Sequence, residues 1–368
     1  MNFDLSEDEE MLKALAERFV NDHYDIDRRR GYLAGAGGFS SDNWSLLAEL
    51  GLVAAPFSED DGGLGLDATA IATVFEALGK GFVVEPLIEN VLVAGRLFAA
   101  VAPQALKDEW LPQLVMGEAR IAFAHAEAGS RPGRQWIETR ASTDGGTVRL
   151  SGEKAYVVGG GAVAGFVVSA RTGGQPGDDA GLGLYFVRAD ADGLSSETWR
   201  LADGSVAVSL TLDGVAAETL AGGMAAVAET QVLASLARSA EALGIMERIF
   251  AETQEYLRTR EQFGTRLASF QAIQHRMVAQ YAVIEQSRAL MNLALVSFGS
   301  DDFTTAVLGL RAFIGAKALG LGHEMIQFHG GMGVTDELSI GHGHKRLLVL
   351  TRWPDDADAA LDAFALAA

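Results

Sequence analysis

The 368-residue chain contains no cysteine, which excludes disulfides, catalytic thiolates and cysteine-ligated metal sites. Basic residues are scarce, because 29 lysines and arginines stand against 49 aspartates and glutamates, giving a net charge of −20. That field repels a phosphate backbone, so we expect no nucleic-acid partner. The absence of cysteine also suits a reducing compartment, and we expect a cytoplasmic protein.

Segments typical of secretion or membrane insertion are missing as well. The first ten residues, MNFDLSEDEE, are acidic rather than basic and apolar, so we expect no signal peptide. No uncharged apolar run reaches 18 residues, so we expect no membrane span. The 43 glycines follow no fixed period, which excludes fibrous and solenoid folds.

Three zones of the chain differ in pattern. Residues 1–116 are predicted to be helical, because Ser6 and Glu9 form a capping box ahead of apolar residues at helical spacing. Those apolar residues are Leu5, Met11, Leu12, Leu15 and Phe19. A Gly-rich turn at 59–63 separates this stretch from further helical segments.

Residues 117–223 carry short β-prone runs between Gly-rich turns, which predicts a small antiparallel β-domain. The runs are Ile121–Ala126, Trp136–Ser142, Val148–Val158, Gly165–Arg171 and Leu182–Val187. Residues 224–368 return to long helical patterns, which predicts a C-terminal four-helix bundle. Its helices are expected at Ala225–Thr259, Ser269–Phe298 and Phe303–Phe328. The fold class is therefore mainly α with a central β-domain.

Four motifs follow one another along this layout. They are Ser58–Gly65 (SEDDGGLG), Leu150–Val158 (LSGEKAYVV), Arg260–Gly264 (REQFG) with Phe270-Gln271 after it, and Gln327–Gly333 (QFHGGMG). Each motif alone is common in other contexts. Together and in this order, the chain resembles the acyl-CoA dehydrogenase family along nearly its whole length. The resemblance implies flavin adenine dinucleotide (FAD) as cofactor, bound between two subunits, and an acyl-CoA thioester as substrate.

By this resemblance, Arg260 reaches the pyrophosphate of the neighbouring subunit's FAD as a charge-assisted donor. Phe263 offers an apolar face to the adenine side. The alternative is that Arg260 forms a surface salt bridge with Glu255 or Glu261, a kind of pair that carries little stability. The accompanying motifs favour the cofactor role.

The same resemblance assigns amide contacts with the cofactor to Gln271 and Gln327. It assigns a close backbone approach to Gly330 and Gly331, because only a residue without Cβ permits it. These four residues and the Arg260–Phe263 pair form the predicted FAD grip.

The other half of the flavin site departs from the family pattern. Where the family carries a T-E-P-x-A-G-S-D-like segment, this chain has Ala124–Arg131; Ser130 is kept, but the preceding hydroxyl position is Ala124. Tyr156 and Val158 replace the aromatic residue and the threonine that flank the flavin, so one hydroxyl donor is lost. The stretch from Ser130 to Ala141 is also slightly longer than the family pattern.

Catalysis in this family needs a carboxylate that removes the α-proton of the thioester. The position where most members carry this glutamate is Pro354 here, which also lacks a backbone N–H. A second family position, on the first bundle helix, is Ala234; Glu241 lies about 10 Å further along the helix. Asp355 and Asp356 adjoin the lost base. The catalytic base is therefore unassigned, with Asp355, Asp356 and Glu241 as candidates.

Three readings remain open. The chain is a heteromer subunit that contributes to a partner's FAD site, a self-sufficient homo-oligomeric enzyme with a relocated base, or a non-enzymatic acyl-CoA- or flavin-binding protein. The first is favoured, because residues serving the neighbour's flavin are kept while those serving the chain's own pocket are lost together. The Asp356-Ala357-Asp358 segment also resembles the smaller partners of two-gene acyl-CoA dehydrogenases of lipid or steroid catabolism. An electron-transfer flavoprotein is the implied acceptor, and His342-Gly343-His344 is not expected to bind a metal.

Overall fold

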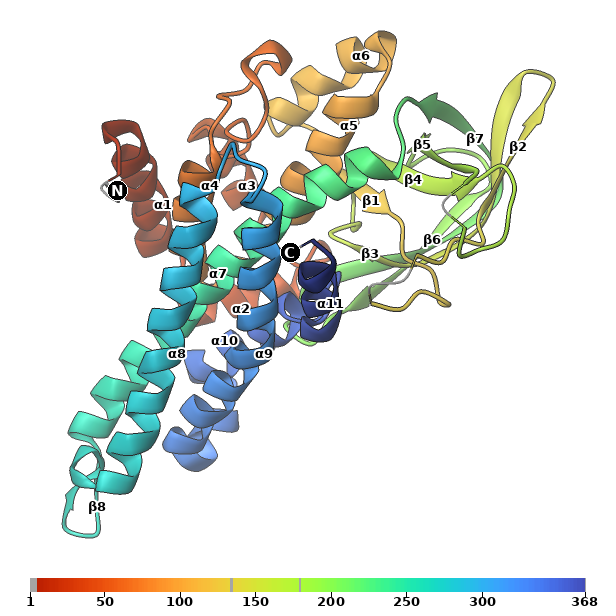
Figure 1. Ribbon diagram of the computed structural model, residues 1–368. Helices are drawn as coiled ribbons and strands as arrows, with labels where there is room; N and C mark the ends of the chain where they lie inside the picture. The colour runs from red at the N-terminus through yellow and green to blue at the C-terminus, as the bar shows by residue number, and fades with distance from the viewer. Residues whose placement is uncertain (1–4, 133–134, 179, 368) are drawn as a thin grey trace. The chain divides into compact units, whose positions relative to one another are not determined.

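The computed structural model describes residues 5–132, 135–178 and 180–367 (Figure 1). The elements before the sheet are α1 (Glu7–His23), α2 (Ile26–Ala34), α3 (Ser41–Glu49), η1 (Glu59–Asp61), α4 (Ala68–Lys80), the π-helix η2 (Ile88–Gly95), α5 (Arg96–Val101) and α6 (Gln104–Val115). The strands are β1 (Ile121–Ala124), β2 (Arg140–Asp144), β3 (Thr147–Val158), β4 (Gly165–Arg171), β5 (Leu182–Arg188), β6 (Leu194–Arg200) and β7 (Val206–Leu220).

The C-terminal part is α7 (Met224–Thr259), the hairpin strands β8 (Glu261–Gln262) and β9 (Thr265–Arg266), η3 (Leu267–Ser269), α8 (Gln271–Val296), α9 (Phe303–His329), η4 (Gly330–Val334), α10 (Ser339–Leu350) and α11 (Ala357–Ala367). Chain order is thus helices, strands and helices, and the predicted fold class is confirmed. The three long C-terminal helices begin and end within a few residues of the predicted ranges.

The first helix forms as its sequence predicts. Ser6 accepts a hydrogen bond from the Glu9 N–H, and Glu9 accepts one from the Ser6 N–H, which completes the capping box. The buried face contains Leu12, Ala16 and Phe19. Met11 was expected on this face but is 57% exposed, because the helix turns it away from the core.

The β-domain is a seven-stranded sheet in the order β1-β4-β2-β3-β7-β5, with β6 added on β7 and a further pairing of β4 with β5. Most neighbours are antiparallel, as predicted. However, β1 pairs with β4 in parallel, and β2 meets β4 in parallel through Arg140 and Arg171. The sheet is therefore mixed rather than wholly antiparallel.

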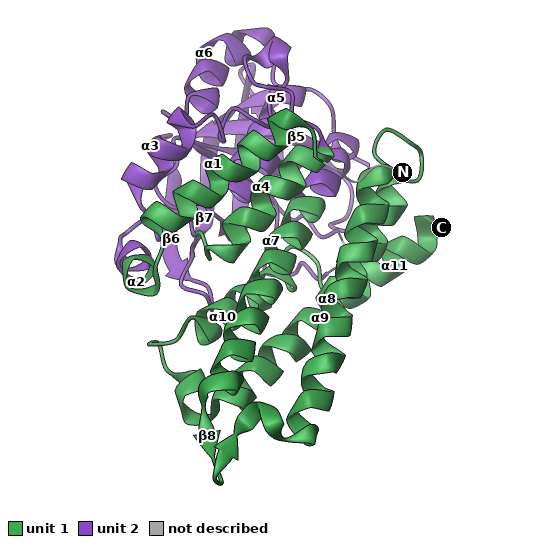
Figure 2. Ribbon diagram, turned by 90° about the vertical axis from the view of Figure 1, so that its left-hand side faces the viewer, with its two compact units in different colours: residues 1–30, 68–83, 235–368 green, residues 31–67, 84–234 purple. Residues whose placement is uncertain are grey.

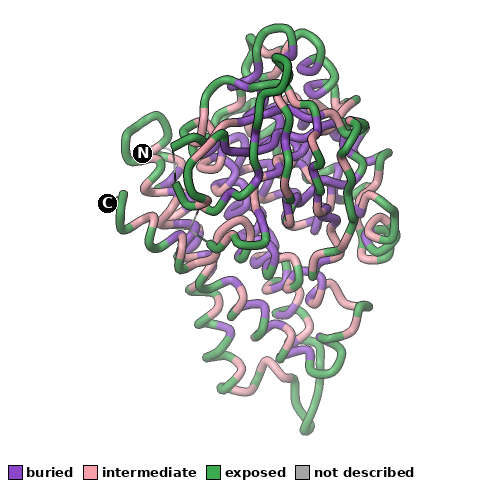
Figure 3. The backbone as a smooth tube through the Cα atoms, turned by 90° about the vertical axis from the view of Figure 1, so that its right-hand side faces the viewer, coloured by how far each residue is buried: buried purple, intermediate pink, exposed green. Residues whose placement is uncertain are grey.

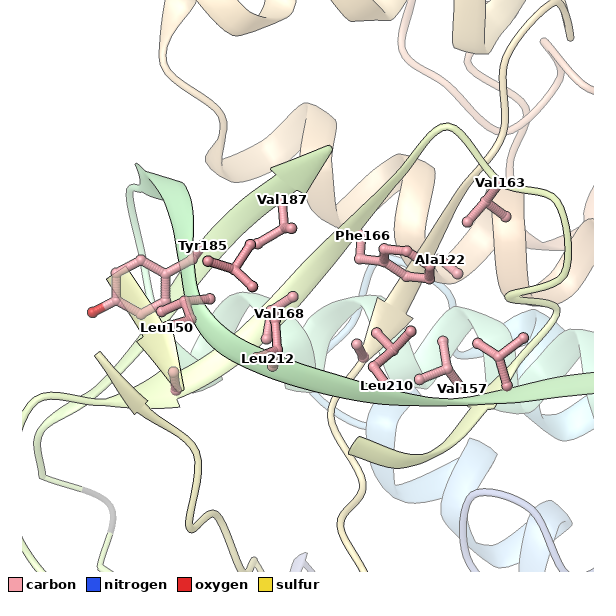
Figure 4. Packing of buried hydrophobic residues seen from close by; sticks show 14 of the residues in the cluster. Ala122, Leu150, Val157, Val163, Phe166, Val168, Tyr185, Val187, Leu210 and Leu212 are labelled. Atoms are coloured by element: carbon pink, nitrogen blue, oxygen red, sulfur yellow. The ribbon is translucent and has the colours of Figure 1, made fainter. Parts of the chain in front are cut away.

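The hydrophobic core of the β-domain lies between facing strands (Figure 4). Ala122 and Ala124 of β1, Val157 of β3, Phe166 of β4 and Leu210 of β7 all belong to it. Since side chains alternate along a strand, the intervening residues of β1 face the other way. Side chains of β1 that point into the core are therefore out of reach of a ligand.

Strand β2 begins later than the predicted run Trp136–Ser142. The N–H groups of Glu138 and Thr139 donate to the Glu127 carboxylate rather than to a neighbouring strand. The Ile137 N–H donates to the Pro176 carbonyl oxygen in a loop. With their donors occupied by a side chain and a loop, these residues do not enter the ladder.

The described residues group into two compact units by their contacts (Figure 2). Unit 1 contains residues 1–30, 68–83 and 235–368, so α1 and α4 group with the C-terminal helices. Unit 2 contains residues 31–67 and 84–234, which include the sheet. This grouping follows contacts rather than chain order, and the division at 116 and 223 stays a prediction.

Within unit 1, α8, α10 and α11 each pack against α9. Two glycines bring α4 and α7 into direct backbone contact. A Cβ on Gly244 would overlap the carbonyl oxygen of Glu76, and a Cβ on Gly79 would overlap that of Glu241. The crossing therefore depends on the absence of both side chains.

The helical segment Phe303–Val334 is long and apolar enough to cross a membrane, with a mean hydropathy of 1.3 over its best window. Half of that window is buried inside the protein, and buried core helices meet the same criteria. The expectation of no membrane partner stays a prediction.

Candidate functional site

The predicted grip residues lie where three helices meet at one end of unit 1. Tyr256 near the end of α7 stacks on His329, the last residue of α9, with ring centroids 4.3 Å apart. Arg276 of α8 pairs with Glu324 at 2.6 Å and lies over the Phe328 ring at 4.7 Å. These contacts hold the end of α7, the start of α8 and the end of α9 together (Figure 1).

A two-residue hairpin, β8–β9, projects from this end. The Leu267 N–H donates to the Arg260 carbonyl oxygen at 2.9 Å and closes its base. Phe263 and Gly264 both have positive φ, 57° and 76°, as a tight primed turn requires. Phenylalanine pays a steric cost there, and its side chain is 89% exposed. Figure 3 shows this tip exposed at the lower end of the molecule.

The Arg260 side chain is exposed, and among the described residues nothing forms an ion pair or hydrogen bond with its guanidinium. The alternative salt bridge with Glu255 or Glu261 does not form. Gln327 is exposed near the end of α9, and Gln271 is the exposed first residue of α8, whose N-cap Phe270 provides no side-chain cap.

The glycine turn beside them is open. Gly330 has φ 58° and ψ −139°, backbone angles that glycine tolerates. A Cβ built on Gly330 or Gly331 would meet no atom within 4 Å. The Arg260 cation, the two amides and the open glycines thus have no side-chain partner among the described residues. Phe263 meets the Phe270 ring edge to face, with centroids 6.2 Å apart. This arrangement fits the phosphate and adenine parts of a dinucleotide.

The β-domain residues of the predicted site are less available for contact with a cofactor than the grip residues. Ser130 Oγ accepts a hydrogen bond from the Glu127 N–H at 2.9 Å and donates to the Trp136 carbonyl oxygen at 3.2 Å, so its proton is used within the loop. Tyr156 is 42% exposed and meets Trp199 edge to face, while Val158 is 8% exposed. Residues 133 and 134 of the lengthened stretch lie outside the described residues.

Ala124 was expected to mark a lost hydroxyl donor in the flavin site, and its position shows otherwise. Its side chain is completely buried in the sheet core, so a hydroxyl there could not reach a cofactor. The loss of donors in this half therefore rests on Val158.

A buried polar network lies behind the same loop. Lys154 Nζ donates to Glu127 Oε1 at 2.6 Å and to the His125 carbonyl oxygen at 3.1 Å. The Thr139 hydroxyl also donates to Glu127 Oε1 at 2.6 Å. His125 Nδ1 and Ser169 Oγ lie 2.9 Å apart. The network joins β3, β4 and the loop that follows β1.

Burial and pairing set the charges of this network. Burial lowers the pKa of Lys154 to about 8 against the raising effect of Glu127. Burial would raise the pKa of Glu127, but Lys154 and the Thr139 hydroxyl hold it below its usual value. Burial first and Lys154 second lower the pKa of His125 to about 4. At neutral pH the network is an ion pair beside a neutral imidazole.

The carboxylates of two candidate bases, Glu241 and Asp356, take part in structural contacts. Arg346 donates from Nε to Glu241 Oε1 at 2.6 Å and from Nη2 to Oε2 at 3.0 Å, so both oxygens of Glu241 are used. Asp356 accepts the Ala359 N–H at 3.0 Å and caps α11. For Asp355, the backbone carbonyl oxygen rather than the carboxylate accepts a hydrogen bond from Arg311.

Other candidate sites are weaker. His342 contacts Arg29 Nη1 and the Asp336 carbonyl oxygen, and the described residues contain no group of three potential metal ligands. Unit 1 has a cavity of about 530 Å³ lined by residues of α1, α4 and α8, but none of the predicted site residues lines it.

Comparisons with known proteins identify the family. The family model "Acyl-CoA dehydrogenase, N-terminal domain" matches residues 6–118, and "Acyl-CoA dehydrogenase, C-terminal domain" matches residues 221–354. Acyl-CoA dehydrogenase FadE27 of Mycobacterium tuberculosis is 27% identical over 308 residues, which cover 80% of this chain and 79% of that protein.

Two solved structures have the same fold. A variant of the Tcur3481-Tcur3483 steroid ACAD is 30% identical with a TM-score of 0.86, covering 98% of this chain and 97% of the other. The ChsE4-ChsE5 complex from Mycobacterium tuberculosis is 24% identical with a TM-score of 0.88, covering 100% and 98%. The chain belongs to the acyl-CoA dehydrogenase family, whose members are FAD-dependent oxidoreductases.

Sequence patterns predicted the grip but assigned no role to His125, Glu127 or Lys154. Lys154 lies in the LSGEKAYVV motif, and the other two lie in the segment Ala124–Arg131. Their contacts join residues separated by between 11 and 44 positions, which a linear motif does not reveal. A lysine pointing into a β-domain core was the available signal, because a buried lysine needs a partner.

Proposed function

We propose that this chain is one subunit of a heteromeric acyl-CoA dehydrogenase, in which it contributes to the FAD site of a different, partner chain. The complex carries out the α,β-desaturation of an acyl-CoA thioester. FAD, when bound, supplies the acceptor for the β-hydride. Cytoplasmic location and electron-transfer flavoprotein as the next acceptor belong to the same proposal.

One observation supports the proposal most: the Arg260 guanidinium and the glycine turn of the grip have no partner among the described residues, while Arg346 binds both oxygens of Glu241. The Arg260 guanidinium has no described partner, and Phe263 is exposed at a strained turn. Strain at an exposed position is typical of a binding site that is completed by another molecule. A second chain's cofactor is the molecule that this family places there.

The residues of this chain have defined tasks in the proposal. Arg260 neutralises pyrophosphate charge, and Phe263 packs against the adenine side. Gln271 and Gln327 exchange hydrogen bonds with polar cofactor atoms, and Gly330 and Gly331 leave the backbone accessible. The carboxylate that removes the α-proton comes from the partner's pocket, since Pro354 offers neither a carboxylate nor an N–H.

The substrate proposed is a bulky acyl-CoA of the steroid side-chain type. The support is the 30% identity to the chain described as a steroid ACAD, together with the D-A-D segment at residues 356–358. Small aliphatic thioesters are expected to react less efficiently with the assembled enzyme.

The test is to purify the chain alone and after co-expression with a second acyl-CoA dehydrogenase chain. FAD per chain is then measured, together with bleaching of its absorbance by short-chain and steroid-type acyl-CoA thioesters. FAD that appears only in the mixed complex, with bleaching there, supports the heteromer. Stoichiometric FAD and bleaching in the chain alone would establish the self-sufficient enzyme instead, and FAD without bleaching in either sample would leave a binding protein.

A further inference from the structure

His342 lies in the first turn of α10 and is buried within unit 1, with only 6% of it exposed. Both of its ring nitrogens have a partner there. Nη1 of Arg29, a residue of α2 that is 1% exposed, lies 3.0 Å from His342 Nδ1. On the other side of the ring, His342 Nε2 lies 3.1 Å from the Asp336 carbonyl oxygen. The imidazole therefore joins α2 to the segment that precedes α10.

The two neighbours fix the tautomer of this ring. A guanidinium group only donates, so His342 Nδ1 is an acceptor and carries no proton. A carbonyl oxygen only accepts, so the ring N–H is on Nε2. The neutral imidazole satisfies both contacts. A second proton would point an Nδ1–H at the N–H of a cation 3.0 Å away, so protonation and the Arg29 contact exclude each other.

The Arg29 side chain is held in place on its other side. Its Nε donates to the Phe82 carbonyl oxygen at 2.9 Å, in the turn after α4. Phe82 has φ 54°, a strained angle for a residue with a Cβ, and is 3% exposed. Its ring lies against α10, because a Cβ on Gly343 would be 3.0 Å from it. Arg29 thus ties α2, the turn after α4 and α10 together at one point.

The charged groups around His342 disfavour a proton on its ring. Burial lowers the pKa of His342 below its ordinary value, and the charges of Arg29 and Lys345 act in the same direction. The carbonyl and carboxylate oxygens of Asp336 oppose this shift. The Asp336 carboxylate is itself paired with Lys345 at 2.9 Å and also interacts with the charge of Arg30.

The charged residues of α7 at this junction are paired with each other. Arg248 lies 5.9 Å from the Phe82 ring centroid and forms an ion pair with Glu252. Glu252 also accepts a hydrogen bond from the Ser339 hydroxyl at the start of α10. Neither charge is among the causes that shift the pKa of His342. A protonated His342 would therefore gain no counter-charge from α7.

The segment that the ring holds is short. Thr335–Leu338 connects η4 to α10, and its middle residues are exposed. Its other side-chain hydrogen bonds among the described residues are the exposed Lys345–Asp336 pair and a bond from the Thr335 hydroxyl to the Met332 carbonyl oxygen. An exposed ion pair contributes little stability. The buried contact through the imidazole is therefore the main polar anchor of this segment.

We infer that Arg29 and His342 form an acid-sensitive latch, which holds Thr335–Leu338 and the start of α10 against α2 while the imidazole is neutral. Protonation of Nδ1 breaks the contact with Arg29, and the ring then moves with its segment toward water. The latch does not depend on the proposed heteromer, because neither a cofactor nor a partner chain takes part in it.

The direction of the pH effect follows from the two states of the ring. In the open state His342 has its ordinary pKa of about 6.5, which is higher than its pKa in the latched state. The open state therefore takes up a proton first as the pH falls. The latch is complete above about pH 6.5 and weakens below it, by up to about tenfold per pH unit.

The test is hydrogen–deuterium exchange of the full-length chain from about pH 7.5 to about pH 5.5, expressed as protection factors so that the intrinsic pH dependence of exchange is removed. Wild type is compared with His342→Gln, whose amide oxygen accepts from Arg29 and whose amide NH₂ donates to Asp336 without titrating. His323→Gln, at an exposed histidine on α9, is the control. Exchange of the histidine ring Cε1 hydrogens in the wild-type chain measures the pKa of His342 without any substitution.

We expect protection of residues 335–343 to fall by up to about tenfold between about pH 6.5 and about pH 5.5 in wild type and in His323→Gln, while α9 keeps its protection. His342→Gln should keep the protection of residues 335–343 constant over this range. Constant protection in wild type, or a parallel loss in wild type and His342→Gln, would overturn the inference. A His342 pKa at or above about 6.5 would also overturn it, and this measurement decides even if His342→Gln does not fold.

Discussion

At the scale of single residues, the partner of a side chain decides its role. Glu241 has a carboxylate on the helix where some family members carry the base, yet Arg346 binds both of its oxygens. The side chains are only 6% and 18% exposed, so the pair is removed from water. A buried pair of this kind costs little while intact and much when one partner is deleted.

We therefore predict that Arg346→Ala lowers the free energy of unfolding by about 3–5 kcal/mol, because Glu241 is left buried and unpaired. Denaturant unfolding of the full chain measures this change. Arg352→Ala, at an exposed arginine just after α10, is the control and should change it by less than about 0.5 kcal/mol. Equal small effects in both variants would contradict the structural role assigned to the pair.

A second prediction for a single residue concerns how the stability of the chain depends on pH. The pKa of His125 in the folded chain, about 4, lies below the ordinary 6.5, so the unfolded chain takes up a proton first as the pH falls. The stability contributed by the neutral ring is complete above about pH 6.5 and is lost toward about pH 4, at up to about 1.4 kcal/mol per pH unit.

Chemical unfolding across about pH 6.5 to about pH 4.5 should therefore show a shallower loss of stability in His125→Gln than in wild type. Parallel curves for the two proteins would mean that the ring protonates freely in the folded state. Glu127 does not confound this window, because its pKa lies below its usual value and its stability is lost at lower pH.

Sequence motifs predicted the residues of the grip because each motif is local, and their binding of FAD stays a prediction. They could not reveal which carboxylates are free. The Glu241–Arg346 pair joins residues 105 positions apart, and the capping bond of Asp356 depends on where α11 begins. The burial of Ala124 likewise follows from strand alternation within a sheet whose order was not predictable.

At the scale of elements, long helices were predicted closely because apolar residues repeat through many turns. Strands β6 and β7 were not predicted. The sequence of β6 lacks apolar alternation, since it pairs with β7 alone at an edge. The sequence of β7 contains Asp213-Gly214, which indicates a turn, but Gly214 takes φ 65° and the strand continues past it.

The crossing of α4 and α7 gives an element-scale prediction. Gly244→Ala should destabilise the chain by more than about 2 kcal/mol, because its Cβ would overlap the Glu76 carbonyl oxygen in α4. Gly320→Ala, inside α9 with no atom within 4 Å, should instead stabilise it by about 0.5–1 kcal/mol. Thermal unfolding of both variants tests these two predictions. A Gly244→Ala variant as stable as wild type would refute the close crossing of α4 and α7.

The β8–β9 hairpin gives a second prediction at the scale of elements. Asparagine tolerates positive φ better than phenylalanine, so Phe263→Asn should leave the isolated chain as stable or more stable by up to about 1 kcal/mol. The same variant should lower FAD retention in the assembled enzyme, because the aromatic contact is lost. Destabilisation of the isolated chain would mean that the phenyl ring serves this chain's own fold.

At the scale of the whole molecule, each of the two units is compact. The predicted grip lies in unit 1, and the sheet with its core cluster lies in unit 2. Family membership supplies FAD and the oxidoreductase class, while Pro354 stands where the resemblance places the catalytic glutamate of most members. Both features support the proposal that the grip serves a cofactor site completed by another chain.

The most direct measurement is FAD retention by the complex with a second acyl-CoA dehydrogenase chain. It compares wild type, Arg260→Ala and Arg258→Ala, the last at an exposed arginine two positions earlier on α7. We predict that Arg260→Ala raises the FAD dissociation constant about ten- to hundredfold, the effect of losing a charged hydrogen bond, while Arg258→Ala stays near wild type. Wild-type FAD affinity in Arg260→Ala would contradict the grip.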